Sequence, residues 1–147
     1  MATQKVWLIT GASRGIGFAA ARRVVAAGDK VALLARGDSV QAAAVELGES
    51  ALAVQADVAD AVSVQAAVDR VVSHWGQLDV IVNNAGLHRG GKVGRLAHED
   101  WQAVLDTNLT GALNVISSAR PHLNEGGAII NVGAVVGFRG FPGDAAY

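Results

Sequence analysis

A glycine-rich stretch near the start of the chain has the residue types and spacing to hold a phosphate group. In "TGASRGIG", Gly11, Gly15 and Gly17 follow the pattern Gly-x-x-x-Gly-x-Gly. A glycine turn that enters a helix lets backbone N–H groups approach a pyrophosphate closely, because no Cβ stands in the way. It is not a Walker A loop, since no Gly-Lys-Ser/Thr follows. An ordinary glycine-rich turn is the alternative, but the position between an apolar run and a helical pattern favours a dinucleotide site.

Two arginines lie where they can select among dinucleotides. An NAD-preferring site usually has an acidic residue at the end of the second strand, about 20 residues beyond the glycine turn. Here that position is Ala35, and Arg36 follows it. Arg14 lies inside the glycine turn, and two guanidinium groups can hold a phosphate with bidentate hydrogen bonds. We therefore predict NADP(H) as the cofactor. The alternative is that Arg36 is a solvated loop charge.

These residues need strands that bring their ends together. Short apolar runs predict buried strands at Val6–Thr10, Val31–Ala35, Ala51–Gln55, Leu78–Asn83 and Gly127–Val132. Helical patterns lie between them: a stripe of Ile16, Ala19, Ala20 and Val24 closing at Gly28; Ala42–Leu47, ending at Gly48; a stripe of Val64, Ala67, Val68, Val71 and Val72, capped by Asp60 and stopped by Gly76; and a long helix from His98 to Ala119, closed by Pro121.

The strand–helix alternation predicts an α/β fold with a doubly wound, Rossmann-type parallel sheet and helices on both faces. In such sheets ligands bind at the carboxyl ends of the strands, which is where this chain has its glycines and polar dipeptides. The sequence shows no internal repeat and no low-complexity linker. We therefore expect residues 1–147 to be the NADP(H)-binding portion of a single Rossmann-type domain, truncated after the fifth strand.

Composition limits the classes of function. The chain has 147 residues, of which 51% are apolar, so it can form a core. It carries 12 basic and 13 acidic residues without a basic cluster, which gives no support for a nucleic-acid partner. No apolar run approaches the ~20 residues of a membrane span. There is no cysteine, no histidine pair with ligand spacing and no signal-peptide layout, so we expect no metal site and a cytoplasmic location.

Four segments, taken in order, carry a family resemblance. They are "TGASRGIG", "NNAG" at 83–86, "TNLTG" at 107–111 and "IINVGAVVG" at 129–137. Together they strongly resemble the short-chain dehydrogenases/reductases, over the whole stretch from Lys5 to Tyr147. Among the members, the sequence looks most like the 3-oxoacyl-carrier-protein reductases and the acetoacetyl-CoA reductases. The resemblance implies hydride transfer between a nicotinamide and a carbonyl or alcohol carbon, usually in a homo-oligomer.

The resemblance also assigns cofactor contacts. It implies that Asp57 bonds the adenine amino group beside Val58, although an acid that starts a turn or helix is the alternative for Asp57. Small residues after the fourth strand leave room for the cofactor, Asn83 can tie neighbouring strands together, and Asn84 is more structural than ligand-contacting. The cofactor-binding set is then Gly11, Ser13, Arg14, Gly15, Ile16, Gly17, Arg36, Asp57, Val58, Asn83, Ala85 and Gly86.

The family moves a proton at the substrate oxygen with an Asn-Ser-Tyr-Lys set. Tyr147 matches the Tyr, whose phenolate must be stabilised if it is to act near neutral pH. Asn108 matches the Asn, which in the family holds a water through a locally opened helix. The alternative for Asn108 is a tolerated polar residue on a helix.

Two of the four groups have no counterpart here. The family's Ser lies three residues after the Asn of the fifth strand and thirteen before the Tyr, and both counts reach Ala134. The family's Lys lies four residues after the Tyr, beyond Tyr147. We therefore expect the chain to be a piece of a longer polypeptide. The fifth strand would then form an uncovered apolar edge of the sheet. We also expect negligible turnover from the chain as given.

The sequence leaves two functions open. One is an NADPH-dependent reductase of a carbonyl, with a β-ketoacyl thioester as the substrate expected from the resemblance. The other is a non-catalytic NADP(H)-binding module or pseudo-enzyme, which Ala134 favours.

Overall fold

A five-stranded parallel sheet forms the centre of the protein. The computed structural model describes residues 4–147. The strands are β1 (Val6–Thr10), β2 (Lys30–Ala35), β3 (Ala51–Gln55), β4 (Leu78–Asn83) and β5 (Leu123–Asn131), in the order β3-β2-β1-β4-β5. Every neighbouring pair is parallel. This confirms the predicted α/β fold with a Rossmann-type sheet.

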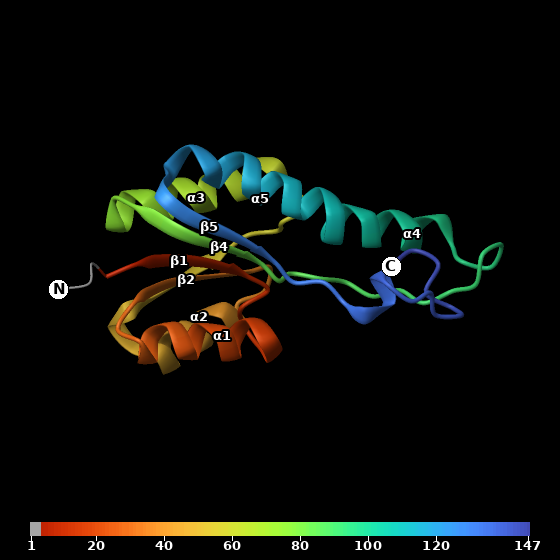
Figure 1. Ribbon diagram of the computed structural model, residues 1–147, viewed down its shortest axis with the longest axis horizontal. Coiled ribbons are helices and arrows are strands. Elements are labelled where there is room, and N and C mark those ends of the chain that lie inside the picture. Colours follow the sequence, from red (N-terminus) through yellow and green to blue (C-terminus); the bar gives the residue numbers. More distant parts are fainter. Residues whose placement is uncertain (1–3) are drawn as a thin grey trace.

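Helices cover both faces of the sheet (Figure 1). On one face lie α1 (Gly15–Ala26) and α2 (Ser39–Leu47), and on the other lie α3 (Ala61–Trp75) and α5 (Gly111–Ala119). Alternate strand residues feed the two cores, because successive side chains of a strand point to opposite faces. Leu8 packs into the core beneath α3 and α5, whereas Ile9 packs into the core beneath α1 and α2.

The helix ends follow the local chemistry of the sequence. Asp60 caps α3, since its carboxylate accepts hydrogen bonds from the backbone N–H of Val62 (2.9 Å) and Ser63 (3.3 Å). Gly76 ends α3 with a φ of 74°, the left-handed conformation that glycine adopts readily. These predicted ends are confirmed. Short 3-10 turns lie at Gly48–Ser50, Arg120–His122 and Val135–Gly137.

The predicted apolar stripe of α1 is only partly right, because Val24 is buried and Ala20 packs against the core, but Ile16 and Ala19 are exposed. Its buried residues are Gly17, Ala21 and Val24, whereas Ile16 is 71% exposed. The face of α1 is set in part by the close approach of Gly17 to the preceding glycine turn, so the helix is rotated partly away from the face that hydrophobicity alone predicted. The predicted start of the fifth strand at Gly127 is also late, because β5 already pairs with β4 at Leu123.

The expected long helix from His98 to Ala119 is opened in the middle. It consists of α4 (His98–Leu105), a π-helical segment (Asp106–Thr110, η2) and α5. Segments of π-helix are rare and occur frequently at functional sites. Asn108 lies in the centre of this segment.

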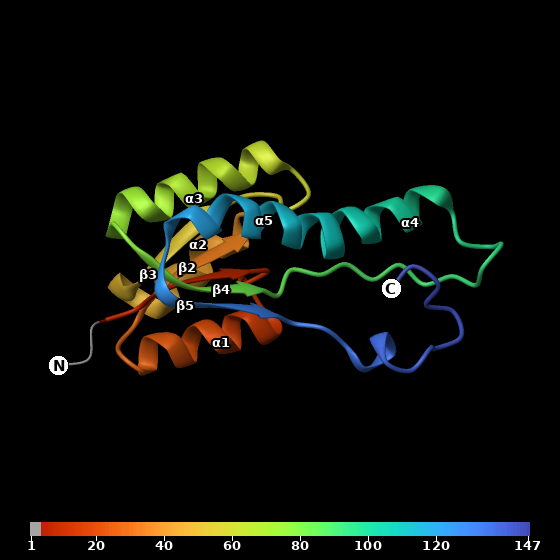
Figure 2. The same ribbon diagram turned by 45° about the horizontal axis from the view of Figure 1, so that its top comes forward.

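A second region projects beyond the carboxyl edge of the sheet (Figure 2). It comprises residues 87–97, α4 and residues 132–147, and we call it the extension. An isolated parallel bridge between Gly91 and Asp144 joins its two loops. The backbone N–H of Gly91 donates to the carbonyl of Gly143 (2.6 Å), and that of Ala145 donates to the carbonyl of Gly91 (3.3 Å).

Candidate functional site

A cleft of about 460 Å³ opens at the carboxyl ends of the central strands. Its volume is in the usual range of small-molecule sites, roughly 300–1,000 Å³. Of the predicted cofactor residues, the cleft is lined by Gly11, Ser13, Arg14, Gly15, Ile16, Arg36, Val58, Ala85 and Gly86. It is also lined by residues that the sequence analysis did not assign to the site, among them Gly37, Ser39 and Thr107.

The glycine turn is packed on its inner side and open on its outer side. A Cβ at Gly17 would lie 2.5 Å from the Asn84 side-chain nitrogen and 2.6 Å from the Gly11 carbonyl oxygen, so no larger residue fits. At Gly15 no atom lies within 4 Å of a Cβ position, and its φ is 59°. The following helix, α1, has no acidic residue in its first turn and no side-chain cap. Its N-terminal N–H groups therefore suit an anion, as a bound pyrophosphate requires.

A set of hydrogen bonds that the sequence analysis did not predict holds the glycine turn against the end of β4. The hydroxyl of Thr10, which is 1% exposed, accepts hydrogen bonds from the backbone N–H of Asn84 (3.0 Å) and Ala85 (2.9 Å). In return the Asn84 side chain donates to the carbonyls of Thr10 (2.9 Å) and Gly11 (3.3 Å). Asn84 thus has the structural role that we inferred for it, and it also lines the cleft.

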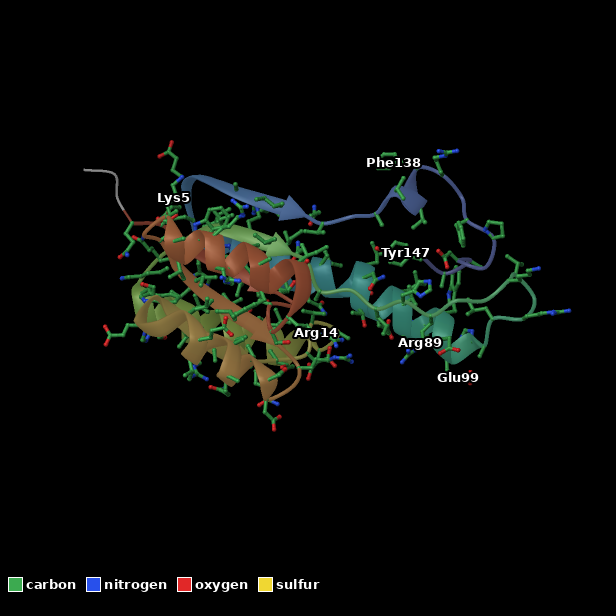
Figure 3. The ribbon with its side chains drawn as sticks, turned by 90° about the horizontal axis from the view of Figure 1, so that it is seen from below. Lys5, Arg14, Arg89, Glu99, Phe138 and Tyr147 are labelled. Atoms are coloured by element: carbon green, nitrogen blue, oxygen red, sulfur yellow. The ribbon has the colours of Figure 1, made fainter. Side chains whose placement is uncertain are left out.

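Both arginines line the cleft, and the last residue of β2, Ala35, is not acidic. Arg14 lies at the N-terminus of α1, at the carboxyl edge of the sheet (Figure 3). Arg36 follows β2, and its carbonyl accepts a hydrogen bond from the Gln55 side chain (2.8 Å). Its guanidinium lies 3.9 Å from a carboxylate oxygen of Asp57. Ala35, where an NAD-preferring site would carry its acid, lines the cleft as well.

Three predicted cofactor residues lie outside the cleft lining. Gly17 is buried beneath the turn. Asp57 accepts a hydrogen bond from the Ala59 N–H (3.0 Å), which is a turn-forming role. Asn83 is buried and donates to the side chain of Asn131 (2.8 Å), so it ties β4 to β5, while its own side-chain oxygen has no hydrogen-bond partner.

Asn108 joins the π-helical segment to the loop after β4. Its side-chain oxygen accepts a hydrogen bond from the Leu87 N–H (2.7 Å), and its amide nitrogen donates to the Leu87 carbonyl (2.9 Å). The neighbouring Thr107 lines the cleft. Asn108 therefore fixes the loop that runs from the cleft into the extension.

Tyr147 and Ala134, two positions of the predicted proton-transfer set, lie outside the lining of the cleft. Tyr147 is 45% exposed and lies in the extension, away from Arg14 (Figure 3). Ala134 is half-buried at the start of the 3-10 turn that follows β5. Neither lines the cleft.

The sequence analysis did not predict a hydrogen-bonded pair of side chains beside Tyr147. A ring nitrogen of His88 lies 2.7 Å from a carboxylate oxygen of Asp144, and the His88 ring centroid lies 6.1 Å from that of Tyr147. No local pattern indicates this pair, because its two residues are 56 positions apart. Between residues 4 and 147 we find no group of three side chains that could ligate a metal ion. No helix in this range is long and apolar enough to span a membrane.

Comparison with known proteins identifies the class to which this fold and cleft belong. The sequence profile described as short chain dehydrogenase matches residues 5–147. The chain is a member of the short-chain dehydrogenase family.

Particular relatives are similar over nearly the whole chain. A 3-oxoacyl-(acyl-carrier-protein) reductase of Staphylococcus aureus is 44% identical, with 100% of this chain and 63% of the relative aligned. The structure of a 3-ketoacyl-(acyl-carrier-protein) reductase from Brucella melitensis complexed with NADH superposes with a TM-score of 0.93 at 33% identity, covering 97% of this chain and 62% of that one. A blue fluorescent protein from a metagenomic library, in complex with NADPH, gives a TM-score of 0.91 at 35% identity over 97% of this chain and 61% of its own. The chain thus spans less than two thirds of the relatives that it matches.

Proposed function

We propose that this chain is the cofactor-binding portion of an NADPH-dependent reductase that converts a carbonyl into an alcohol. Its substrate class is a β-ketoacyl thioester, for which the support is the similarity to 3-oxoacyl-(acyl-carrier-protein) reductases. The observation that carries the cofactor choice is the pair Arg14 and Arg36 on the cleft, with Ala35 in place of an acid. The similar structures hold NADPH in one case and NADH in another, so the choice rests on this chain's own residues.

Each part of the cleft has a distinct task in this proposal. The glycine turn and the N-terminus of α1 hold the pyrophosphate. Arg14 and Arg36 hold the 2′-phosphate, since guanidinium groups match phosphate geometry. The bound cofactor supplies the hydride. Tyr147 moves a proton at the substrate oxygen, and Asn108 positions the Leu87 loop that leads from the cleft toward Tyr147. Following the family resemblance, we place this activity in a cytoplasmic homo-oligomer.

A comparison of two cofactors tests the proposal. Arg36→Ala removes charge-assisted hydrogen bonds to the 2′-phosphate, so we expect the Kd for NADPH to rise by roughly 10- to 100-fold. The Kd for NADH, which has no 2′-phosphate, should change less than about twofold. Fluorescence titration measures both constants. Arg22→Ala, on the exposed side of α1 outside the cleft, is the matched control. An unchanged NADPH affinity in Arg36→Ala, or tighter binding of NADH than of NADPH by the unaltered chain, contradicts the proposal.

A second candidate function is a non-catalytic NADP(H)-binding module, and Ala134 favours it. A preorganised hydrogen-bond donor to a developing oxyanion is worth about 100- to 1,000-fold in rate. If the protein is a reductase, Ala134→Ser in the polypeptide that carries these residues should speed NADPH oxidation by an acetoacetyl thioester about 100-fold. A binding module predicts no gain on the same thioester.

A further inference from the structure

Arg36 faces two anions, one in the chain and one in the proposed cofactor. We propose that Asp57 acts as an internal counter-ion that competes with the 2′-phosphate for Arg36, and thereby lowers the preference for NADPH over NADH. This inference rests on the proposed function, because it concerns the selectivity of the same cleft.

The carboxylate of Asp57 is fixed more firmly than the arginine that it attracts. One oxygen of Asp57 accepts the Ala59 N–H (3.0 Å), and the Asp57 N–H donates to the Ser63 hydroxyl (3.2 Å). The other oxygen lies 3.9 Å from the Arg36 guanidinium. Arg36 is held at its carbonyl by Gln55, while its side chain is 62% exposed. The side chain of Arg36 is therefore the part that can turn, either toward Asp57 or into the cleft that it lines.

The competition is between two anions for one guanidinium. Asp57 does not line the cleft, so a bound phosphate and the carboxylate approach Arg36 from different positions. The pair is solvent-exposed, and such pairs contribute little to folding. Its effect on selectivity is nevertheless direct, because the energy that Arg36 gains from Asp57 in the free chain must be given up when Arg36 turns to the phosphate. NADH has no phosphate at this position and makes no such demand on Arg36.

The ratio of two dissociation constants isolates this effect. Contacts to adenine, ribose and pyrophosphate are common to NADPH and NADH, so they cancel in Kd(NADH)/Kd(NADPH). This includes the adenine contact that the family resemblance implies for Asp57. Asp57→Asn removes the charge but keeps a side-chain oxygen for the Ala59 N–H. We expect the ratio to rise roughly two- to fivefold, the range that an exposed ion pair supports.

The experiment is a titration of four variants with NADPH and NADH at one ionic strength. Asp60→Asn is the matched control, since it removes a charge from the same turn, keeps a good helix cap and leaves Arg36 alone. Its ratio should stay within about 1.5-fold of the parent value. Arg36→Ala and Arg36→Ala/Asp57→Asn complete a double-mutant cycle, in which Asp57→Asn should no longer move the ratio. Circular dichroism of each variant confirms an unchanged fold.

The outcomes separate this inference from the proposed function. An Asp57→Asn ratio that is unchanged or lower overturns the inference while an Arg36-dependent NADPH preference still stands. An equal rise in Asp60→Asn, or a rise that persists without Arg36, also overturns it, since the effect is then general repulsion of the phosphate. If the parent chain binds neither cofactor, the proposed function fails, and the inference fails with it.

Discussion

The cofactor cleft and the extension are built in different ways. At the cleft the backbone is packed so closely that Gly11 and Gly17 leave no room for a Cβ. In the tail of the extension no atom lies within 4 Å of a Cβ position at Gly133, Gly137 or Gly140, although Gly91 in its other loop packs closely against Leu96. Large apolar side chains there face solvent, with Phe138 93% exposed. The cleft is part of the folded core, whereas the extension is attached to it.

The attachment depends on a small set of long-range contacts. Asn108 bonds the loop at Leu87, His88 pairs with Asp144, and Gly91 bridges to the tail. Arg89 adds an exposed ion pair to Asp100 of α4 (3.5 Å). The cleft, by contrast, is formed mainly by the glycine turn and by residues at the carboxyl ends of neighbouring strands. We infer that cofactor binding tolerates changes in the extension but not changes beneath the glycine turn.

The largest expected effect is at Gly17. Gly17→Ala should lower the free energy of unfolding by about 3 kcal/mol, because the new Cβ would meet the Gly11 carbonyl and the Asn84 amide. This clash outweighs the ~1 kcal/mol that alanine gains over glycine in a helix. Urea unfolding measures the change. Gly133→Ala in the extension is the control, expected within about 0.5 kcal/mol of the parent. Equal losses at both positions would remove the distinction between the two regions.

A smaller effect is expected at Asn108. Asn108→Ala leaves the Leu87 N–H and carbonyl without their partner, which costs about 1–2 kcal/mol. Since the bonds hold the extension, hydrogen exchange at the Leu87 amide should quicken at least tenfold, while the Kd for NADPH changes less than about threefold. The exposed Asn124, whose side chain bonds only Asp79 among residues 4–147, provides the control Asn124→Ala. Unchanged exchange at Leu87 would show that Asn108 does not hold the loop.

The sheet could be predicted from the sequence because its strands are continuous apolar runs. The bounds of β1, β3 and β4 agree with the predicted ranges. Helix caps such as Asp60 and Gly76 were also predictable, since they act locally. The buried face of α1 was predicted only in part, because a tertiary contact of Gly17 helps to decide it. The start of β5 at Leu123 was missed for a similar reason, since pairing with β4 rather than apolar content determines it.

In the candidate site, too, the residues with a local sequence signal were predicted and those that depend on tertiary contacts were missed. The glycine turn and both arginines were found from spacing after predicted strands. The role of Thr10 was missed, because its hydroxyl accepts a hydrogen bond from the backbone of Asn84, 74 residues away, and such a contact has no local sequence signal. The pairs Arg36–Asp57 and His88–Asp144 were missed because they depend on how loops from different strands meet. Sequence therefore indicates several groups that line the candidate site, and the structure shows how they are held.

The central claim is that Arg14 and Arg36 bind a 2′-phosphate while the glycine turn binds the pyrophosphate. Phosphorus NMR of NADP⁺ tests it directly, because the 2′-phosphate and the pyrophosphate give separate resonances. On adding the chain we predict that both sets of resonances shift, and that Arg36→Ala reduces the shift of the 2′-phosphate while the pyrophosphate shift remains. A pyrophosphate shift with no change at the 2′-phosphate would contradict the claim.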